Sequence, residues 1–467
     1  MLSMDRNLTG KKPTFAKSGP KNNPYRVLLW IVLIVALGWF VTQVGIGPEH
    51  RFQPAFMPTP TPTRSATSYL MEADARFNAG VVSDAEKVDA IESYQQALEL
   101  EPENATAWAE LARLLTYSSS LLPTQGEKIE RMAEARQAVE QAVALAPDDS
   151  TVNAVNALVL DWSASVSTDP DQAQRWLVQA EQAAGKAYNE DPENYLALAF
   201  YAEVLLDQQK WSQAEQHART AVELAPNVMD THRVYATVLE TFGQYRVAIE
   251  EYEKAASINP NLTFLYINIG LNYRTLAVRS ENPDSAKLIY EQALEYFSKA
   301  AQINEANNVQ DPIPYIAIAK TYAQTGDFFA ASRNAQKALS FNSTNPVTYG
   351  QLGDIYRRAR NYESAVLVLE CVVDGCTQER AQQIVDDLEL AIDVPGPVEK
   401  LPLTNDEAGW FYAMYGSALA ALSRPNANQC PEALAVMSQV SQAFPENALL
   451  MGIVEENQAI CRIVSEQ

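Results

Sequence analysis

The chain has 467 residues, more than one ordinary domain holds, and a formal net charge of −23. Its length therefore requires several domains or one extended array. The acidic balance disfavours a nucleic-acid partner, and none of the glycine-rich motifs that cradle phosphate occurs, so we expect no cofactor.

The first two segments predict a membrane anchor. Residues 1–26 are a basic tail, with six lysines or arginines against one aspartate. Residues 27–47 carry no charge, and about 20 apolar residues suffice to cross a bilayer as a helix. The alternative is a cleaved signal peptide, but its apolar core is shorter, and VTQVGIG is a poor cleavage site. The basic tail should hold the N-terminus in the cytoplasm and place the rest outside the cell membrane of a bacterium.

Residues 48–67 form a linker in which proline alternates with threonine. Proline favours the extended polyproline II conformation, so this segment is expected to act as a semi-rigid spacer. An O-glycosylated stalk or a ligand for a proline-binding domain is the alternative, and only composition favours it.

A repeated pattern begins near Ser68. Ala248, Tyr252, Ala255 and Pro260 follow the spacing A-x3-Y-x2-A-x4-P, and related copies recur over most of the chain, most of them 34 or 45 residues apart. A period of this size is typical of stacked repeats. Small alanines let a neighbouring helix approach closely, and proline ends the helix. The first alanines of the nine copies are Ala90, Ala135, Ala180, Ala214, Ala248, Ala293, Ala331, Ala365 and Ala433.

Each alanine-rich helix follows a helix with larger apolar residues, as in Tyr349, Leu352, Gly353 and Tyr356. These two patterns resemble W-x2-L-G-x2-Y and A-x3-F-x2-A-x4-P of the tetratricopeptide repeat family. The resemblance covers residues 68–376 and 407–467, separated by an irregular connector at 377–406. It implies an all-α, right-handed α-solenoid of about nine helix-turn-helix repeats, with a final capping helix and a concave groove that binds peptides or partner proteins.

The array departs from the family pattern at a few positions. The 45-residue spacings imply three insertions of 11 residues, and Asn153 stands where an aromatic residue is usual. The connector is either a loop that inserts at the groove or a degenerate repeat. The family's carboxylate clamp, which grips chaperone C-termini, has no match here.

The groove is expected on the side of the first helices that faces away from the packing residues. Basic residues on that side of an acidic array favour an acidic partner segment, whereas the alternative is an ordinary solvated surface. The candidate groove residues are Arg233, Phe264, Asn268, Arg274, Ile313, Ile316, Lys320 and Arg357.

The four cysteines all lie in the last quarter of the chain. Cys430 and Cys461 are equidistant from the turn of an antiparallel helical hairpin, so a disulfide between them is predicted. Cys371 and Cys376 flank an expected turn, and a second disulfide is predicted between them. A metal site would require more ligands, and disulfides agree with an exported location.

Catalysis finds little support, because none of the three histidines belongs to a visible triad or ligand cluster. We therefore expect a membrane-anchored protein-binding scaffold outside the cytoplasm, without enzymatic activity. One alternative is an assembly factor or co-chaperone for cell-envelope or secreted proteins. The other is a sensor or enzyme whose site lies in the connector at 377–406.

Overall fold

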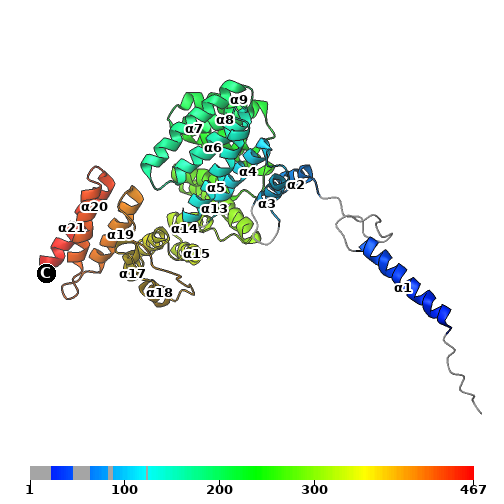
Figure 1. Cartoon of the computed structure of the whole chain (residues 1–467). Helices are drawn as coiled ribbons and strands as arrows, with labels where there is room; N and C mark the ends of the chain where they lie inside the picture. The colour runs from blue at the N-terminus through cyan, green and yellow to red at the C-terminus, as the bar shows by residue number, and fades with distance from the viewer. Residues whose placement is uncertain (1–22, 46–63, 83–87, 123–124, 467) are drawn as a thin grey trace, which may run out of the picture. The chain divides into compact units, whose positions relative to one another are not determined.

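The computed structural model describes residues 23–45, 64–82, 88–122 and 125–466. The chain divides into two compact units, residues 1–63 and residues 64–467. Within the described residues the secondary structure is helical apart from two isolated bridges, which agrees with the predicted all-α class (Figure 1). Most of the predicted basic tail and of the proline-threonine linker lies outside the described residues.

The first unit contains helix α1 (Pro24–Gly45), which coincides with most of the predicted membrane span at 27–47. Side chains are described as far as Phe40, and the large apolar ones, including Leu28 and Ile34, are exposed. Across the described part of the chain, no helix is both long enough and apolar enough to cross a membrane. The helix is therefore confirmed, and the membrane span is not supported. Residues 46 and 47 and the side chains from residue 41 lie outside the described part.

The second unit is a stack of antiparallel helix pairs, and nine such pairs lie within its described residues, as the repeat count predicts. In each pair a first helix is followed by a second, alanine-patterned helix. The pairs are α2 (Ala66–Asn78) with α3 (Ala90–Leu100), α4 (Ala105–Ser119) with α5 (Gln125–Leu145), α6 (Ser150–Val166) with α7 (Pro170–Glu190), α8 (Tyr195–Asp207) with α9 (Trp211–Leu224), α10 (Met229–Thr241) with α11 (Tyr245–Ile258), α12 (Thr263–Val278) with α13 (Pro283–Ala306), α14 (Ile313–Thr325) with α15 (Phe328–Phe341), α16 (Pro346–Arg358) with α17 (Tyr362–Val373), and α19 (Asp406–Leu422) with α20 (Cys430–Ala443).

The alanines of the repeat pattern form the contacts between paired helices. All nine first alanines, from Ala90 to Ala433, have a relative exposure of 0%. Large side chains fill the space beside them, and Tyr252 and Phe297 are among the most completely buried. Gly270 shows how tight this packing is, because a Cβ added there would lie 2.4 Å from the ring of Phe297. Small residues thus set the spacing between the helices, as predicted.

The predicted insertions are taken up mainly by longer helices. The ordinary pair α8 and α9 has helices of 13 and 14 residues, whereas α12 and α13 have 16 and 24. The first helix of the longer pair is thus 3 residues longer and the second 10 residues longer than in the ordinary pair.

One side chain in the first turn of the first helix has the same role in several repeats. Tyr266 and Tyr349 donate hydrogen bonds to the carbonyl oxygen six residues upstream, at 2.7 and 3.0 Å. Trp108 makes the equivalent bond at 2.9 Å. Asn153 donates to the oxygen of Pro147 at 2.8 Å, so the residue that breaks the aromatic pattern preserves the bond. The third repeat is therefore regular in structure.

The connector at 377–406 contains one helix, α18 (Gln378–Asp387), which buries Ala381, Ile384 and Val385. A loop follows, and Val398 pairs with Cys376 through two backbone hydrogen bonds of 2.8 and 2.9 Å. The last helix, α21 (Ala448–Glu466), packs on α19 and α20 at the end of the stack, as expected for a capping helix.

The N-terminal repeats also contact repeats far along the chain. The side-chain amides of Asn259 and Asn261 donate to the backbone oxygens of Phe77 and Ala79, at 3.2 and 2.7 Å, across 182 residues of sequence. Arg113 on α4 pairs with Asp230 on α10 at 2.7 Å, and the hydroxyl of Tyr117 donates to the same carboxylate. We call this set of contacts the long-range closure. It brings successive turns of the coil together.

Candidate functional site

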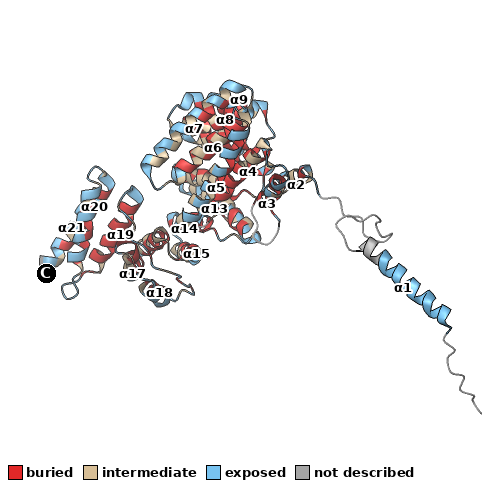
Figure 2. Cartoon of the chain, in the orientation of Figure 1, coloured by how far each residue is buried: buried red, intermediate tan, exposed pale blue. Residues whose placement is uncertain are grey.

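The first helices form the inner face of the stack. Neighbouring first helices contact one another, in the sequence α4, α6, α8, α10 and again α12, α14, α16, α19. Figure 2 shows that α8 and α19 are largely buried, while α9 and α20 expose much of their surface. The predicted groove residues lie on these first helices, and the inner face is therefore the candidate binding surface.

A hollow of about 660 Å³ opens on the inner face between α6, α8, α10, α11 and α12. We call it the inner hollow. It brings together three of the predicted groove residues, namely Arg233, Phe264 and Asn268. The remaining lining residues are Trp162, Glu203, Thr237, Glu240, Thr241, Tyr245, Tyr252 and Thr275.

Arg233 is not a free cation in this hollow. Its side chain is buried, with 3% of the residue exposed, and its two terminal nitrogens donate to the two carboxylate oxygens of Glu203, each at 2.7 Å. Trp162 donates to the same carboxylate at 3.2 Å. A neighbouring first helix therefore already supplies the counter-charge of Arg233, and an acidic partner for the groove remains a prediction.

Glu240 is held by hydrogen bonds from two other helices. Tyr252 on α11 and Asn272 on α12 donate to Oε2 of Glu240, at 3.2 and 3.0 Å. Among the described residues no salt bridge involves Glu240. Its other oxygen, Oε1, is therefore the polar group that this carboxylate offers to the hollow.

Further acidic groups lie behind the hollow on α6 and α8. Burial raises the pKa of Asp161 well above its ordinary value, and the nearby carboxylates of Glu203 and Asp207 raise it further. Burial also raises the pKa of Asp207, which shares a hydrogen bond with Asp161. A carboxyl pair in this setting retains a proton more readily than an isolated aspartate, since two close negative charges are unfavourable in a desolvated site.

The predicted basic residues farther along gather on α12, α14 and α16. Lys320 approaches Glu407 at 3.8 Å, and its pKa is lowered by burial and by the positive charge of Arg274. Burial likewise lowers the pKa of Arg274, and Arg357 pairs with Asp354 at 3.2 Å. Each cation here has a carboxylate or aromatic neighbour, but Lys320 and Arg274 remain close enough to repel each other.

The two apolar groove candidates differ in their surroundings. Ile313, in the first turn of α14, has 36% of its surface exposed. Ile316 packs against the small cluster of Ala301, Tyr315 and Ala338 and therefore contributes to packing between repeats. Ile313 is therefore the more exposed of the pair, and Ile316 is partly buried.

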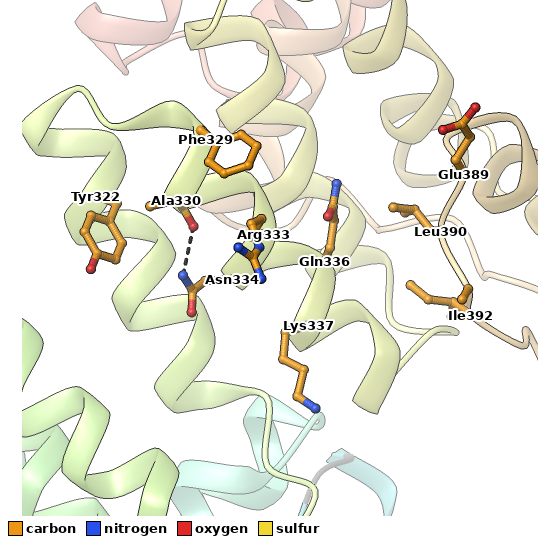
Figure 3. A pocket seen from close by; sticks show the side chains of 11 residues that line it. Tyr322, Phe329, Ala330, Arg333, Asn334, Gln336, Lys337, Glu389, Leu390 and Ile392 are labelled. Carbon is orange, nitrogen blue, oxygen red and sulfur yellow. Dashed lines mark hydrogen bonds between the residues drawn. The ribbon is translucent and has the colours of Figure 1, made fainter.

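A second hollow, of about 570 Å³, lies beside the connector. Figure 3 shows Arg333 and Lys337 of α15 on one side and Leu390 and Ile392 of the loop on the other. Phe329 stands at its edge with 74% of its surface exposed. Since α15 is a second helix, this hollow is separate from the inner hollow.

Both predicted disulfides are confirmed. Cys371 is bonded to Cys376 and Cys430 to Cys461, with Cα atoms 4.8 and 5.4 Å apart. The second bond ties the start of α20 to α21, the capping helix. Both bonds lie in the C-terminal repeats, where they close short loops.

Sequence reasoning missed Trp162, Glu203 and Glu240. Glu240 could have been found, because it lies 34 residues before Arg274 and occupies the same position in the preceding repeat. Trp162 and Glu203 gave no such signal. Their roles depend on contacts between helices of different repeats, which the spacing along one helix does not reveal.

The comparison with protein families yields one match. Residues 234–262, which cover most of α10, all of α11 and the turn after it, match the tetratricopeptide repeat. This segment is therefore similar to one tetratricopeptide repeat. No curated protein matches the sequence.

Two solved structures are similar to parts of this chain. A human IFIT1 dimer with m7Gppp-AAAA is 16% identical with a TM-score of 0.50, and the match covers 88% of this chain and 91% of that one. The thermophilic tetratricopeptide repeat protein TTC0263 of Thermus thermophilus is 17% identical with a TM-score of 0.35, over 44% of this chain and 98% of that one. At these identities the likeness concerns the fold alone.

Proposed function

We propose that this chain is a scaffold that binds peptide segments of partner proteins along its inner face, without making or breaking covalent bonds. The inner hollow is the observation that carries the proposal. It combines a volume of about 660 Å³ with four aromatic side chains and several polar groups converging from five helices. Binding sites typically have this combination of an apolar wall and a few fixed polar groups.

The fold supports this function. Tetratricopeptide repeat proteins generally mediate contacts between proteins, and the first helices of this chain contact one another in two runs, α4 to α10 and α12 to α19. Because each repeat mainly contacts its neighbours, a bound segment would gain affinity from many modest contacts along the stack. The inner hollow and the Lys320 region would then be two parts of one binding surface.

The proposal includes a tether to a membrane, with the repeats outside the cytoplasm. Two features favour it: the charge-free run at 27–47 follows a basic tail, and the two disulfides are typical of an oxidising compartment. The run extends beyond the described side chains, so its insertion requires a direct test. Full-length chain expressed in a bacterium should remain in the membrane pellet after alkaline washing, and protease added outside the membrane should digest the repeats. Release into the wash would contradict the tether.

Partner binding can be tested by cross-linking the full-length chain to its neighbours in the native membrane. The informative variant combines Arg274→Glu with Arg357→Glu, which reverses two charges on the inner face. We expect lower yields of the cross-linked partner and an unchanged thermal unfolding temperature. The matched control combines Arg246→Glu with Arg462→Glu, at two exposed arginines outside the first helices.

The control should capture partners as the unchanged chain does. If the inner-face variant keeps the fold and captures the same partners at the same yield, the inner face around Arg274 is not the binding surface. If the unchanged chain cross-links to no protein at all, the scaffold function itself is overturned.

A further inference from the structure

We propose that the inner hollow binds one positively charged side chain of the partner peptide, the ammonium of lysine or the guanidinium of arginine. The inference rests on the proposed function and adds the chemical class of segment that the scaffold recognises. The sequence led us to expect an acidic partner. The inference differs from that expectation because Arg233, the basic residue of the hollow, is already paired with Glu203.

The charge balance of the hollow is negative. Two acidic residues and one basic residue line it, namely Glu203, Glu240 and Arg233, and the guanidinium of Arg279 lies outside the lining, 4.7 Å from the ring centre of Tyr245. Arg233 forms a two-pronged ion pair with Glu203, which uses both carboxylate oxygens. Glu240 keeps no cationic partner among the described residues, so one negative charge is left over. Such a charge in a partly desolvated site is stabilised by a ligand that brings a positive charge.

Glu240 is also positioned to receive a donor. Tyr252 and Asn272 fix its Oε2 from two sides, and the carboxylate cannot rotate freely without losing these bonds. Fixed carboxylates bind ammonium and guanidinium groups through charge-assisted hydrogen bonds, which are stronger than neutral ones. Oε1 is then the acceptor for the N–H of the ligand.

The aromatic walls suit the same ligand. Trp162, Tyr245 and Phe264 line the hollow, and a cation within about 6 Å of such a ring is attracted to its face. Two of these rings already interact with cations of the chain. The guanidinium of Arg279 lies 4.7 Å from the ring centre of Tyr245, and that of Arg233 lies 5.7 Å from Trp162. The walls would therefore also hold the aliphatic part of a lysine or arginine side chain.

One residue that lines the hollow also has a buried donor without a partner among the described residues. Nε of Arg233 is buried and has no hydrogen-bond partner among the described residues. Leaving such a donor unsatisfied is costly. A backbone carbonyl next to the basic residue of a bound peptide would supply an acceptor after a small shift of the Arg233 side chain. A peptide provides the cation and the carbonyl together, whereas a simple metal ion or amine does not.

The test uses the full-length chain in mild detergent and four pools of fluorescent dodecapeptides. The pools are identical except for a fixed central residue, which is lysine, arginine, norleucine or glutamate. Fluorescence anisotropy measures the binding of each pool. We expect the lysine and arginine pools to bind at least about tenfold more tightly than the glutamate pool, as a charge-assisted hydrogen bond implies.

Two substitutions then locate the effect. Glu240→Gln keeps the shape and an oxygen acceptor but removes the charge, so the preference for the basic pools should fall to about threefold or less. Glu240→Lys places a cation of the chain itself in the hollow, and the basic pools should lose their advantage entirely. Glu250→Gln, at an exposed position of α11, is the matched control and should leave the preference unchanged. Thermal unfolding of each variant checks that the fold is retained.

The outcomes separate this inference from the proposed function. If all four pools bind equally well, or if the glutamate pool binds best, the inference is overturned and the scaffold function remains. A preference for basic pools that persists in both folded Glu240 variants also overturns it, because the cation would then bind elsewhere. If no pool binds, although cross-linking captures a protein, recognition does not use a basic side chain and the inference is likewise overturned.

Discussion

The N-terminal and C-terminal repeats are built from the same helix pair but are stabilised differently. Two hydrophobic cores meet within α14, since Ile318 belongs to one and Ala319 to the other. The N-terminal core is reinforced by the long-range closure, which joins residues more than 100 positions apart. The C-terminal core contains both disulfides, which join residues 5 and 31 positions apart. Contacts between distant repeats thus stabilise the N-terminal half, and disulfide bonds stabilise the C-terminal half.

The largest expected effect comes from breaking the closure. Asp230→Ala removes the buried carboxylate that Arg113 and Tyr117 share, and it leaves the buried guanidinium of Arg113 with Glu110 as its remaining carboxylate partner. Loss of one member of a buried pair costs about 3–5 kcal/mol of unfolding free energy. Denaturant unfolding should show this loss, and hydrogen exchange should rise in α4 and α10 but not in α20. Asp387→Ala, at an exposed residue of α18, should change stability by less than about 0.5 kcal/mol.

Removing the disulfide of the capping helix should have the next largest effect. With Cys430→Ala and Cys461→Ala, the loop of 31 residues is no longer closed, and about 3–4 kcal/mol should be lost. Cys371→Ala with Cys376→Ala opens a much shorter loop and should cost about 2 kcal/mol. Hydrogen exchange in α8 to α11 should remain unchanged in both variants. Equal losses, or losses in the N-terminal repeats, would contradict the division into two differently stabilised halves.

Asp311 lies between the two halves and gives a pH-dependent test. Burial raises its pKa to about 6, above the value of an exposed aspartate, so the folded chain holds this proton more tightly than the unfolded chain. Stability from this group is therefore present at low pH and lost as the pH rises from about 4 to about 6. Asp311→Asn should stabilise the fold at pH 8 by about 2–3 kcal/mol and much less at pH 4.5. Denaturant unfolding of both proteins at the two pH values measures the difference.

The smallest expected loss of stability tests whether the repeat unit is built in the same way in both halves. Tyr266→Phe and Tyr349→Phe each remove a hydrogen bond to the carbonyl six residues upstream, one in each half. We expect each to cost about 1 kcal/mol. Similar losses would show that the unit itself is the same in both halves, whereas a loss confined to Tyr266 would show that the closure changes the repeat.

The repeated unit was predictable because its cause is local. Alanine at a fixed interval allows close packing between adjacent helices, and this is true for Ala90 as it is for Ala433. The disulfides followed from the same reasoning, since an antiparallel hairpin brings Cys430 and Cys461 together. The length of α13 was not predictable in this way, because the sequence marks an insertion without saying that it continues the helix.

The candidate site was only partly predictable. Arg233, Phe264 and Asn268 do line one hollow, as positions on the same side of the first helices suggested. The pairing of Arg233 was not predictable, because Glu203 lies 30 residues earlier and contacts Arg233 from the first helix of the preceding repeat. The contact between Arg113 and Asp230 depends on the pitch of the coil, which no short spacing in the sequence encodes.

The hydrogen bond from Asn259 to Phe77 has a consequence for how this architecture can change in length. A linear array can lose or gain a unit at either end, since only the adjoining unit is affected. Here the first helix pair of the array contacts repeats that follow almost two hundred residues later in the sequence. Trimming the start of the array would therefore damage its middle, so new units are more easily added beyond the disulfide-bonded end than removed from the beginning.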